Sequence, residues 1–445
     1  MKKVLVLGAG LVSRPLVRYL IAQPDFSVTV ATRTVSKAEA LVAGHPRGGT
    51  TALLSEDTAR LEKLIADHDL AVSLLPAPQH PTVAKLCIQH RKHMVTTSYV
   101  SPQMRALDEA ARTAGVVLLN EIGVDPGIDH MSAMRIVHAV QKRGGRVVSF
   151  KSYCGGLPAP EANDNPWGYK FSWSPRAVCT AGKNAARFRE DGKLVEIPGP
   201  ELFTCHHPLQ VAGIGELEAY PNRDSLSYID LYGLEGIETM FRGTLRYPGW
   251  CRCLTAVVDL GMLDETPVTY PAGMTLAQWT AGLIKARSAN DLRQQVAQFL
   301  QMEPHADPLD RLAWLGLFSN QPLPITGRPT TALDILAARM NEKMPYQPGE
   351  RDMVVLVHRF VARFPGQPDE HIRSELIDFG EPDGDTAMAR TVSLPAAIGA
   401  KLILTGGIHD AGVHIPVTPR IYNPVLDELA TMNIRCVEET VSAET

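Results

Sequence analysis

The sequence lacks several features that mark specialised classes of protein. No apolar run approaches the roughly 18 residues that a membrane-spanning helix needs. Basic residues number 44 and acidic residues 48, so the formal net charge is −4, without the basic surplus that nucleic-acid binders carry. The seven cysteines are scattered over 445 residues, which favours reduced thiols in a cytoplasmic protein over a disulfide framework. The sequence therefore predicts neither a membrane nor a nucleic-acid partner.

The sequence does contain enough apolar material for several cores. Hydrophobic residues make up 45% of the chain, which is ordinary for a globular protein and argues against disorder. With roughly 100–200 residues in a typical domain, the length predicts two or three domains. The first apolar stretch is too short for the core of a signal peptide, and it runs directly into a strand pattern.

Short β-rich runs alternate with helical patterns in the first third of the chain. The runs lie at 3–7, 27–31, 69–75, 93–97, 116–119 and 147–153, and Gly48-Gly49 has the character of a loop tip. One intervening helical pattern ends at Gly115, a natural helix stop. Apolar strands separated by helices indicate a parallel sheet covered on both faces.

The segment after the first run has a dinucleotide-binding pattern. Gly8 permits a tight turn, and Gly10 lets a pyrophosphate approach the backbone where a helix begins. Ser13 replaces the third glycine and is small enough for close packing of helix on strand. An ordinary strand–helix turn is the alternative, but the place of this turn in a βαβ pattern favours a nucleotide site. The predicted fold class is α/β, with a Rossmann-type doubly wound domain.

The end of the second run indicates which dinucleotide is bound. An NAD site usually has an acidic residue about 20 positions after the turn, and none is present here. Arg33 stands at that distance from Ser13, and Thr32 and Thr34 flank it with hydroxyl groups. A guanidinium pairs well with a 2′-phosphate, so the sequence favours NADP over NAD. The alternative is that Arg33 is a solvated residue at a helix start.

Several longer motifs lie between residues 96 and 247. They read TTSYVSP at 96–102, NEIGVDPGIDH at 120–130, SYCGGLPAPE at 152–161, DNPWGYKFSWS at 164–174, YPNRDS at 220–225 and RGTLRY at 242–247. Together they closely resemble the saccharopine reductase family, the NADP-dependent, L-glutamate-forming saccharopine dehydrogenases. The resemblance runs from the first strand through the region 395–424.

This resemblance implies a reversible hydride transfer at a C–N bond in lysine metabolism. In one direction, L-2-aminoadipate 6-semialdehyde condenses with L-glutamate, and NADPH reduces the imine to saccharopine. In the other direction, NADP oxidises saccharopine to an imine that water hydrolyses. Two alternatives stay open: another NADPH-dependent imine reductase of the opine or polyamine type, and a non-catalytic NADP-binding sensor.

The resemblance also implies three domains and a homodimer. An NADP-binding Rossmann domain covers 1–130, and the segment 420–445 returns to it. A mixed α/β domain for substrate binding and dimerisation covers 131–265 and 350–420. An inserted all-helical domain covers 266–349, in agreement with helical spacing at 276–300, 309–318 and 331–344. Strand patterns return at 353–360 and 372–379, and a helix with Pro395 in its first turn is expected from about 394 to 405.

Saccharopine has three carboxylates and two amino groups, so its site needs arginines and an acid. By resemblance, Arg223 and Arg246 hold substrate carboxylates. The structural alternatives are a salt bridge between Arg223 and Asp224, and a turn at Asp125 before Pro126. The substrate-binding residues implied are Ser98, Tyr99, Asp125, Cys154, Arg223, Thr244, Leu245 and Arg246.

Condensation and imine hydrolysis also need proton transfers, for which Tyr99, Asp125 and Cys154 are the candidate catalytic residues. A buried inert thiol is the alternative for Cys154. No metal is expected, because the Cys251-Arg252-Cys253 segment lacks a second cysteine pair at zinc-site spacing. The residues expected at NADP(H) are Gly8, Ala9, Gly10, Leu11, Val12, Thr32, Arg33, Thr34, Leu75, Thr97, Ser98, Val124, Asp125, Pro126 and Trp173.

Overall fold

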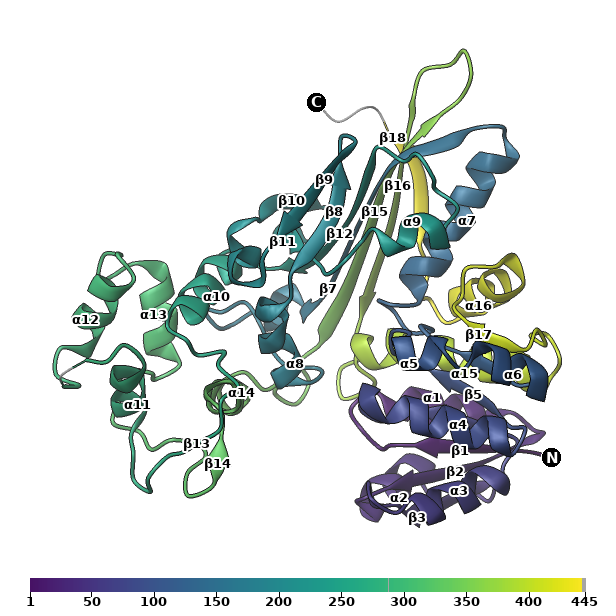
Figure 1. The fold of residues 1–445 in the computed structure, drawn as a ribbon, viewed down its shortest axis with the longest axis horizontal. Coiled ribbons are helices and arrows are strands. Elements are labelled where there is room, and N and C mark those ends of the chain that lie inside the picture. The colour runs from purple at the N-terminus through teal and green to yellow at the C-terminus, as the bar shows by residue number, and fades with distance from the viewer. Residues whose placement is uncertain (287, 442–445) are drawn as a thin grey trace. The chain divides into compact units, whose positions relative to one another are not determined.

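The computed structural model describes residues 1–286 and 288–441, and the chain divides into two compact units. The first unit comprises Met1–Val147 and Leu356–Thr445, and the second comprises Val148–Val355. Figure 1 shows the elements of both units by label and by position along the chain. The boundary between the units falls inside two long strands, β7 (Arg146–Pro158) and β15 (Asp352–Arg363).

The first unit is built on a seven-stranded sheet in the order β17-β6-β5-β4-β1-β2-β3. All pairings in this sheet are parallel. The strands β4 and β6 are buried along their whole length, as expected for a sheet with helices on both faces. The strands are β1 (Lys2–Leu7), β2 (Phe26–Thr32), β3 (Gly48–Ala52), β4 (Leu70–Ser73), β5 (His93–Thr96), β6 (Val117–Leu119) and β17 (Gly412–His414).

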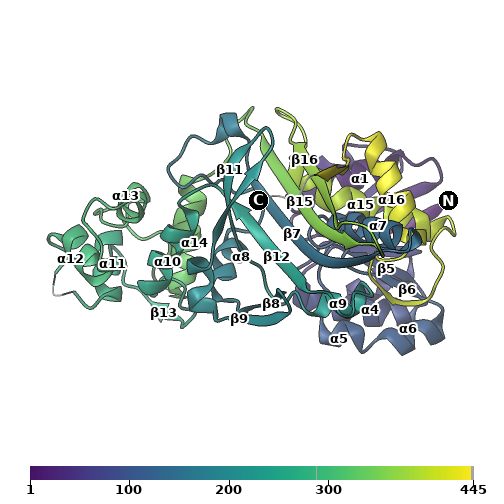
Figure 2. The same cartoon turned by 90° about the horizontal axis from the view of Figure 1, so that it is seen from above.

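Helices cover this sheet and complete the α/β fold that the sequence predicted. They are α1 (Ser13–Ala22), α2 (Val35–Val42), α3 (Thr58–Ala66), α4 (His80–Gln89), α5 (Pro102–Arg105), α6 (Asp108–Ala114), α7 (Ile128–Lys142), α15 (Ala387–Leu404) and α16 (Pro419–Thr431), with the short η1 (Ala77–Gln79) before α4. Helix α15 packs against α1, β4 and β5, and α16 packs against α15 and α7 (Figure 2). The strand β16 (Glu370–Phe379) pairs antiparallel with β18 (Val437–Val441).

Two local expectations for the first unit are wrong. Gly48-Gly49 is not a loop tip but the start of β3. A Cβ on Gly48 would press against Val42 and Ile21, so the close packing of this strand requires a glycine at position 48. Helix α15 begins at Ala387 rather than near 394, because the Thr386 side chain caps it by accepting the N–H of Ala389. Pro395 therefore lies inside the helix and not in its first turn.

Helix α15 is also long and apolar enough to cross a membrane by length and composition, although no such span was expected. Within the unit, however, 67% of this span is buried, and the helix packs on α1 and on the sheet. It has the character of a core helix.

The C-terminal fifth of the chain, from Leu356 onwards, belongs with the first unit. The assignment of 350–420 to the substrate domain stays a prediction, but Leu356 onwards clusters with the dinucleotide-binding residues. The reason is that β17 extends the parallel sheet beside β6 and that α15 packs on α1. Boundaries at 265 and 349 for a separate helical insert stay a prediction.

The second unit combines a sheet with a group of helices. Its strands follow the order β10-β11-β12-β7, and β8 pairs with β12 and β9. Besides β7, the strands are β8 (Ala186–Glu190), β9 (Lys193–Ile197), β10 (His207–Val211), β11 (Gly215–Pro221) and β12 (Thr239–Arg246). The helices near this sheet are η2 (Pro160–Ala162), α8 (Pro175–Thr180), η3 (Ala181–Lys183), η4 (Gly199–Thr204), α9 (Ser227–Leu231) and α10 (Trp250–Asp259).

The segment expected to be an all-helical insert contains one further ribbon. Its helices are α11 (Leu276–Leu283), α12 (Leu292–Phe299), α13 (Asp307–Trp314) and α14 (Ala332–Lys343). Helices α11, α12 and α13 lie together in both views (Figures 1 and 2). The two-residue strands β13 (Val268–Thr269) and β14 (Pro329–Thr330) pair antiparallel, so this segment is not entirely helical.

Candidate active site

The turn between β1 and α1 has the geometry that a pyrophosphate needs. Gly8 has φ +109°, and a Cβ there would lie 3.2 Å from the carbonyl oxygen of Leu74, so a side chain is disfavoured. A Cβ on Gly10 would meet nothing within 4 Å, so the space beside this residue is open. The part of the chain that the structure describes offers no acceptor for the N–H groups of Ala9, Leu11 and Val12. Unsatisfied N–H groups at a helix start are suited to an anion.

Ser13 stands at the position of the third glycine of the dinucleotide-binding pattern, and its side chain makes two hydrogen bonds within the turn. Its hydroxyl accepts the N–H of Gly10 at 3.0 Å and donates to the carbonyl of Gly8 at 3.4 Å. The side chain is fully buried, so this bracing takes place inside the turn. The serine thus fixes the turn by hydrogen bonds that a glycine cannot make.

The end of β2 presents an arginine to solvent. Thr32 ends the strand, Arg33 is exposed, and Thr34 precedes α2 without capping it by its side chain. Among residues 1–286 and 288–441, no hydrogen bond or ion pair to the Arg33 guanidinium is present. A guanidinium without a protein partner at this strand end fits a 2′-phosphate, as the sequence predicted.

The carboxyl ends of β4 and β5 bring together polar groups that the sequence reasoning found only in part. Leu75 and Thr97 follow these strands and are half-buried, and so is Ser98. The residue that the sequence reasoning missed is His80, whose Nε2 lies 2.9 Å from the Ser98 hydroxyl. Burial lowers the pKa of His80 to about 4, so its ring is neutral near pH 7.

Tyr99 and Asp125 form a direct pair in the first unit. The Tyr99 hydroxyl donates to Oδ1 of Asp125 at 3.0 Å. The buried Glu121 supports the same loop, because its Oε1 accepts the N–H of Val100 at 2.8 Å and its Oε2 lies 2.8 Å from Nε2 of His130. A phenol and a carboxylate in contact have the chemistry to bind an ammonium and to move a proton.

The loop that carries Asp125 is unusually tight. A Cβ on Gly127 would lie 2.1 Å from the carbonyl oxygen of Gly123, and Gly127 has φ +148°. The N–H of Gly127 donates to Oδ1 of Asp129 at 2.5 Å. This loop places Val124, which is buried, and Pro126 beside Asp125, and all three were expected near the nicotinamide.

The last three residues of β12, in the second unit, are predicted substrate-binding residues: Thr244, Leu245 and Arg246. Thr244 pairs with Cys154 of β7 on one side and with Tyr220 of β11 on the other. Leu245 is fully buried, and a Cβ on Gly155 would lie 2.7 Å from its carbonyl oxygen. Cys154 is buried, with 8% of its surface exposed.

Arg246 is a buried cation among aromatic rings. Its guanidinium carbon lies 4.9 Å from the Tyr169 ring centre and 5.4 Å from that of Trp250. Its NH1 donates to the Leu245 carbonyl at 2.7 Å, and its buried Nε has no partner in the described part of the chain. Burial acts to lower the pKa of Arg246, but the Tyr220 and Tyr169 phenols outweigh it and the pKa is raised.

No carboxylate of the described residues pairs with Arg246. A buried charge without a counter-ion costs free energy, so this arrangement favours an anionic ligand.

The two remaining predicted residues have different surroundings. Arg223 is exposed, and the Asp224 carboxylate accepts NH1 of Arg187 at 3.1 Å. Trp173 is half-buried, and its Nε1 donates to the Tyr169 hydroxyl at 3.1 Å. Trp173 therefore belongs to the aromatic group around Arg246 in the second unit, whereas the other predicted cofactor residues lie in the first. Each assignment of a predicted residue to substrate or cofactor stays a prediction.

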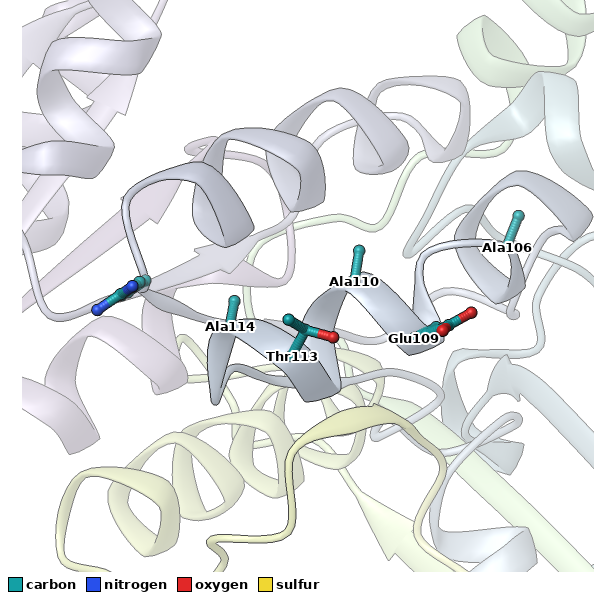
Figure 3. Close-up of a pocket in the computed structure, with 6 residues that line it drawn as sticks. Ala106, Glu109, Ala110, Thr113 and Ala114 are labelled. Carbon is teal, nitrogen blue, oxygen red and sulfur yellow. The ribbon is translucent and has the colours of Figure 1, made fainter.

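A pocket in the first unit lies elsewhere. Figure 3 shows this pocket, of about 590 Å³, on α5 and α6, with Ala106, Glu109, Ala110, Thr113 and Ala114 around it. Arg91 also lines this pocket, and none of its lining residues was predicted for the site. The strand ends, where polar groups converge, are the better candidate.

A parallel doubly wound sheet with this glycine turn and an arginine at the end of β2 defines an NADP-binding α/β oxidoreductase. Family models agree: residues 4–119 match the saccharopine dehydrogenase NADP binding domain and residues 123–434 match the saccharopine dehydrogenase C-terminal domain. The chain belongs to the saccharopine dehydrogenase family. The predicted family and the NADP cofactor are thereby confirmed.

Individual relatives are similar over the full length. Saccharopine dehydrogenase [NADP(+), L-glutamate-forming] of Schizosaccharomyces pombe is 43% identical over 100% of both chains. The apo enzyme structure from Saccharomyces cerevisiae is 39% identical, with a TM-score of 0.89 over 99% of this chain and 100% of that one. Alpha-aminoadipic semialdehyde synthase of Bos taurus is 35% identical over 97% of this chain but only 47% of its own length.

A homospermidine synthase structure from Legionella pneumophila shares the fold, with a TM-score of 0.58 at 10% identity.

Proposed function

We propose that this protein interconverts saccharopine with L-glutamate and L-2-aminoadipate 6-semialdehyde by an NADP-dependent hydride transfer at a C–N bond. The observation that carries the proposal is Arg246, a buried guanidinium without a carboxylate partner among the described residues. The names of the full-length relatives give the same reaction class. A polyamine has no carboxylate to offer this arginine, and a sensor that binds only NADP has no need of it.

The first unit provides the residues that fit NADP(H). The N–H groups of Ala9, Leu11 and Val12 suit the pyrophosphate, and Arg33 suits the 2′-phosphate. When bound, NADP(H) supplies the hydride acceptor or donor, which is chemistry that side chains lack. The contribution of this chain is to bind, orient and protonate.

Proton transfers fall to three side chains in this proposal. The Tyr99 hydroxyl, which donates to Asp125, can pass a proton at the substrate nitrogen, and the Asp125 carboxylate balances a cationic ammonium or iminium. Cys154 is the third candidate. Arg223 and Arg246, with Thr244 and Leu245 beside Arg246, bind the substrate carboxylates.

Two further attributes belong to the same proposal. The family resemblance supports a homodimer, which light scattering of the purified protein tests. The cysteines in the described ranges are all free thiols, and most are buried, which supports a cytoplasmic location.

The direct test of the function is NADPH formation with saccharopine as substrate. Parallel reactions with other secondary-amine amino acids and with polyamines separate this function from that of another imine reductase. NADP binding without turnover of any of these substrates would instead support the sensor.

A further inference from the structure

One buried histidine bridges the carboxyl ends of β4 and β5. His80 begins α4 and is 3% exposed. Its Nδ1 lies 2.9 Å from the hydroxyl of Ser73, the last residue of β4. Its Nε2 lies 2.9 Å from the hydroxyl of Ser98 and 3.3 Å from that of Thr96, the last residue of β5. Both ring nitrogens therefore have partners, and the ring cannot rotate without losing them.

The groups that face this ring are hydroxyls, not charges. Burial lowers the pKa of His80 to about 4, so the neutral ring has one donor and one acceptor nitrogen near pH 7. Because the ring is buried and neutral, it suits a fixed orientation better than a proton relay to solvent.

The backbone of Ser98 is already fixed by other bonds. Its N–H donates to the hydroxyl of Thr96 at 3.4 Å, and its carbonyl accepts the N–H of Glu121 at 3.2 Å. With the backbone fixed, only the orientation of the Ser98 side-chain hydroxyl can still vary. Ser98 is half-buried at the sheet edge where open α/β folds place their ligands.

We propose that His80 is a positioning residue that directs the Ser98 hydroxyl towards a carboxylate of the amino-acid substrate. In this proposal the ring carries its proton on Nε2, so the Ser73 hydroxyl donates to Nδ1 and the Nε2–H group donates to the oxygen of Ser98. The hydroxyl hydrogen of Ser98 is then turned away from the ring and is available to a carboxylate oxygen. The inference rests on the proposed function, because it assigns this hydroxyl to the substrate of the same site.

Replacing His80 by Asn or by Gln tests its hydrogen bonds to Ser73 and Ser98 one at a time, because the two side-chain amides differ in length. In His80→Gln the amide can reach the Nε2 position and bond Ser98, whereas in His80→Asn it reaches only the Nδ1 position and Ser73. We expect His80→Asn to raise the KM for saccharopine about tenfold with less than about threefold change in kcat, because a hydrogen bond to a charged group is lost. We expect His80→Gln to restore the KM to within about threefold of wild type.

His68 provides a matched control in the same unit. It is also buried with both ring nitrogens bonded, to the Leu64 carbonyl at 2.6 Å and to the Thr29 hydroxyl at 2.8 Å. It precedes β4 and so lies at the opposite end of that strand from Ser73. His68→Asn should destabilise the fold without changing the saccharopine KM.

A double-mutant cycle with Ser98→Ala tests whether His80 acts through Ser98. We expect His80→Asn to add no further increase in KM in the Ser98→Ala background. Ser73→Ala removes only the donor to Nδ1, so the ring proton is no longer confined to Nε2. If His80→Asn does not fold, the KM increase of Ser73→Ala should likewise disappear in the Ser98→Ala background. An unchanged KM in His80→Asn and in Ser73→Ala, or a KM increase that persists without the Ser98 hydroxyl, would overturn the inference alone. A wild-type enzyme that forms no NADPH from saccharopine would overturn the proposed function as well.

Discussion

Single residues differ in how far their roles can be predicted from the sequence. Gly8, Gly10 and Arg33 are predictable because the local order of strand, turn and helix determines where they lie. His80 is not, because its role depends on side chains 7 and 18 positions away that meet only in the folded sheet. The two hydrogen bonds of the Ser13 hydroxyl could not be predicted either, because the sequence shows only that this residue is small.

Arg33 should determine the choice between NADP and NAD. Arg33→Ala removes an exposed guanidinium without a partner among the described residues, so folding should be unaffected. The KM for NADP should rise about 10- to 100-fold, the range expected for charge-assisted hydrogen bonds to a phosphate, and the KM for NAD should change little. Steady-state kinetics with both cofactors is the measurement. Equal effects on both would contradict the 2′-phosphate role.

The Arg246 guanidinium should lower the stability of the unliganded protein and raise the affinity for saccharopine. Arg246→Met keeps apolar contact with Tyr169 and Trp250 but removes a buried charge that has no carboxylate partner within 1–286 and 288–441. We expect the melting temperature of the unliganded variant to equal or exceed that of wild type. The KM for saccharopine should rise about 100-fold or more.

Arg187→Met is the control for this variant, because Arg187 is an exposed arginine already paired with Glu196 and Asp224. It should leave both the melting temperature and the KM near wild type. An Arg246→Met protein that melts earlier and binds saccharopine normally would make Arg246 a structural residue.

The Cys154→Ser variant tests whether the Cys154 thiol is the proton-transfer group. If this thiol is the obligatory proton-transfer group, Cys154→Ser should lower kcat by about 100-fold or more and change the pH–rate profile. The measurement is kcat against pH for both proteins. A profile that keeps its shape, with a small loss of rate, would leave Tyr99 and Asp125 as the proton-transfer groups and Cys154 as a packing residue.

At the scale of elements, periodicity predicted most strands and helices but not their exact ends. The strand β3 was missed because its two glycines look like a turn, whereas packing against Val42 and Ile21 requires a glycine at position 48. The start of α15 was placed too late because Pro395 was assigned to a first turn, whereas Thr386 caps the helix earlier. Tertiary contacts decided both cases.

Two glycines should respond differently to the same substitution. Gly10→Ala adds a methyl group where nothing lies within 4 Å, so the fold should persist while NADPH binding weakens by about tenfold or more. Gly127→Ala places a methyl group 2.1 Å from the Gly123 carbonyl oxygen, so the protein should lose about 4 kcal/mol or more of stability, or fail to fold. Thermal unfolding and fluorescence titration with NADPH measure both. Normal NADPH binding by Gly10→Ala would place the pyrophosphate elsewhere.

At the scale of the whole molecule, the predicted residues fall into two groups, one in each compact unit. The first unit contains the anion-binding turn, Arg33 and the Tyr99–Asp125 pair, and the second contains Arg246 with its aromatic neighbours. The class of fold was predictable because six strand runs alternate with helices. The return of Leu356 onwards to the first unit was not, because it depends on β17 and α15 packing against elements far away in the sequence.

The measurement that tests the account most directly is the absorbance of NADPH after the purified protein is mixed with saccharopine and NADP. The account predicts NADPH formation that saturates with saccharopine, is much weaker with NAD, and is accompanied by stoichiometric L-glutamate. Absence of NADPH at every saccharopine concentration, from a folded protein that binds NADP, would contradict it.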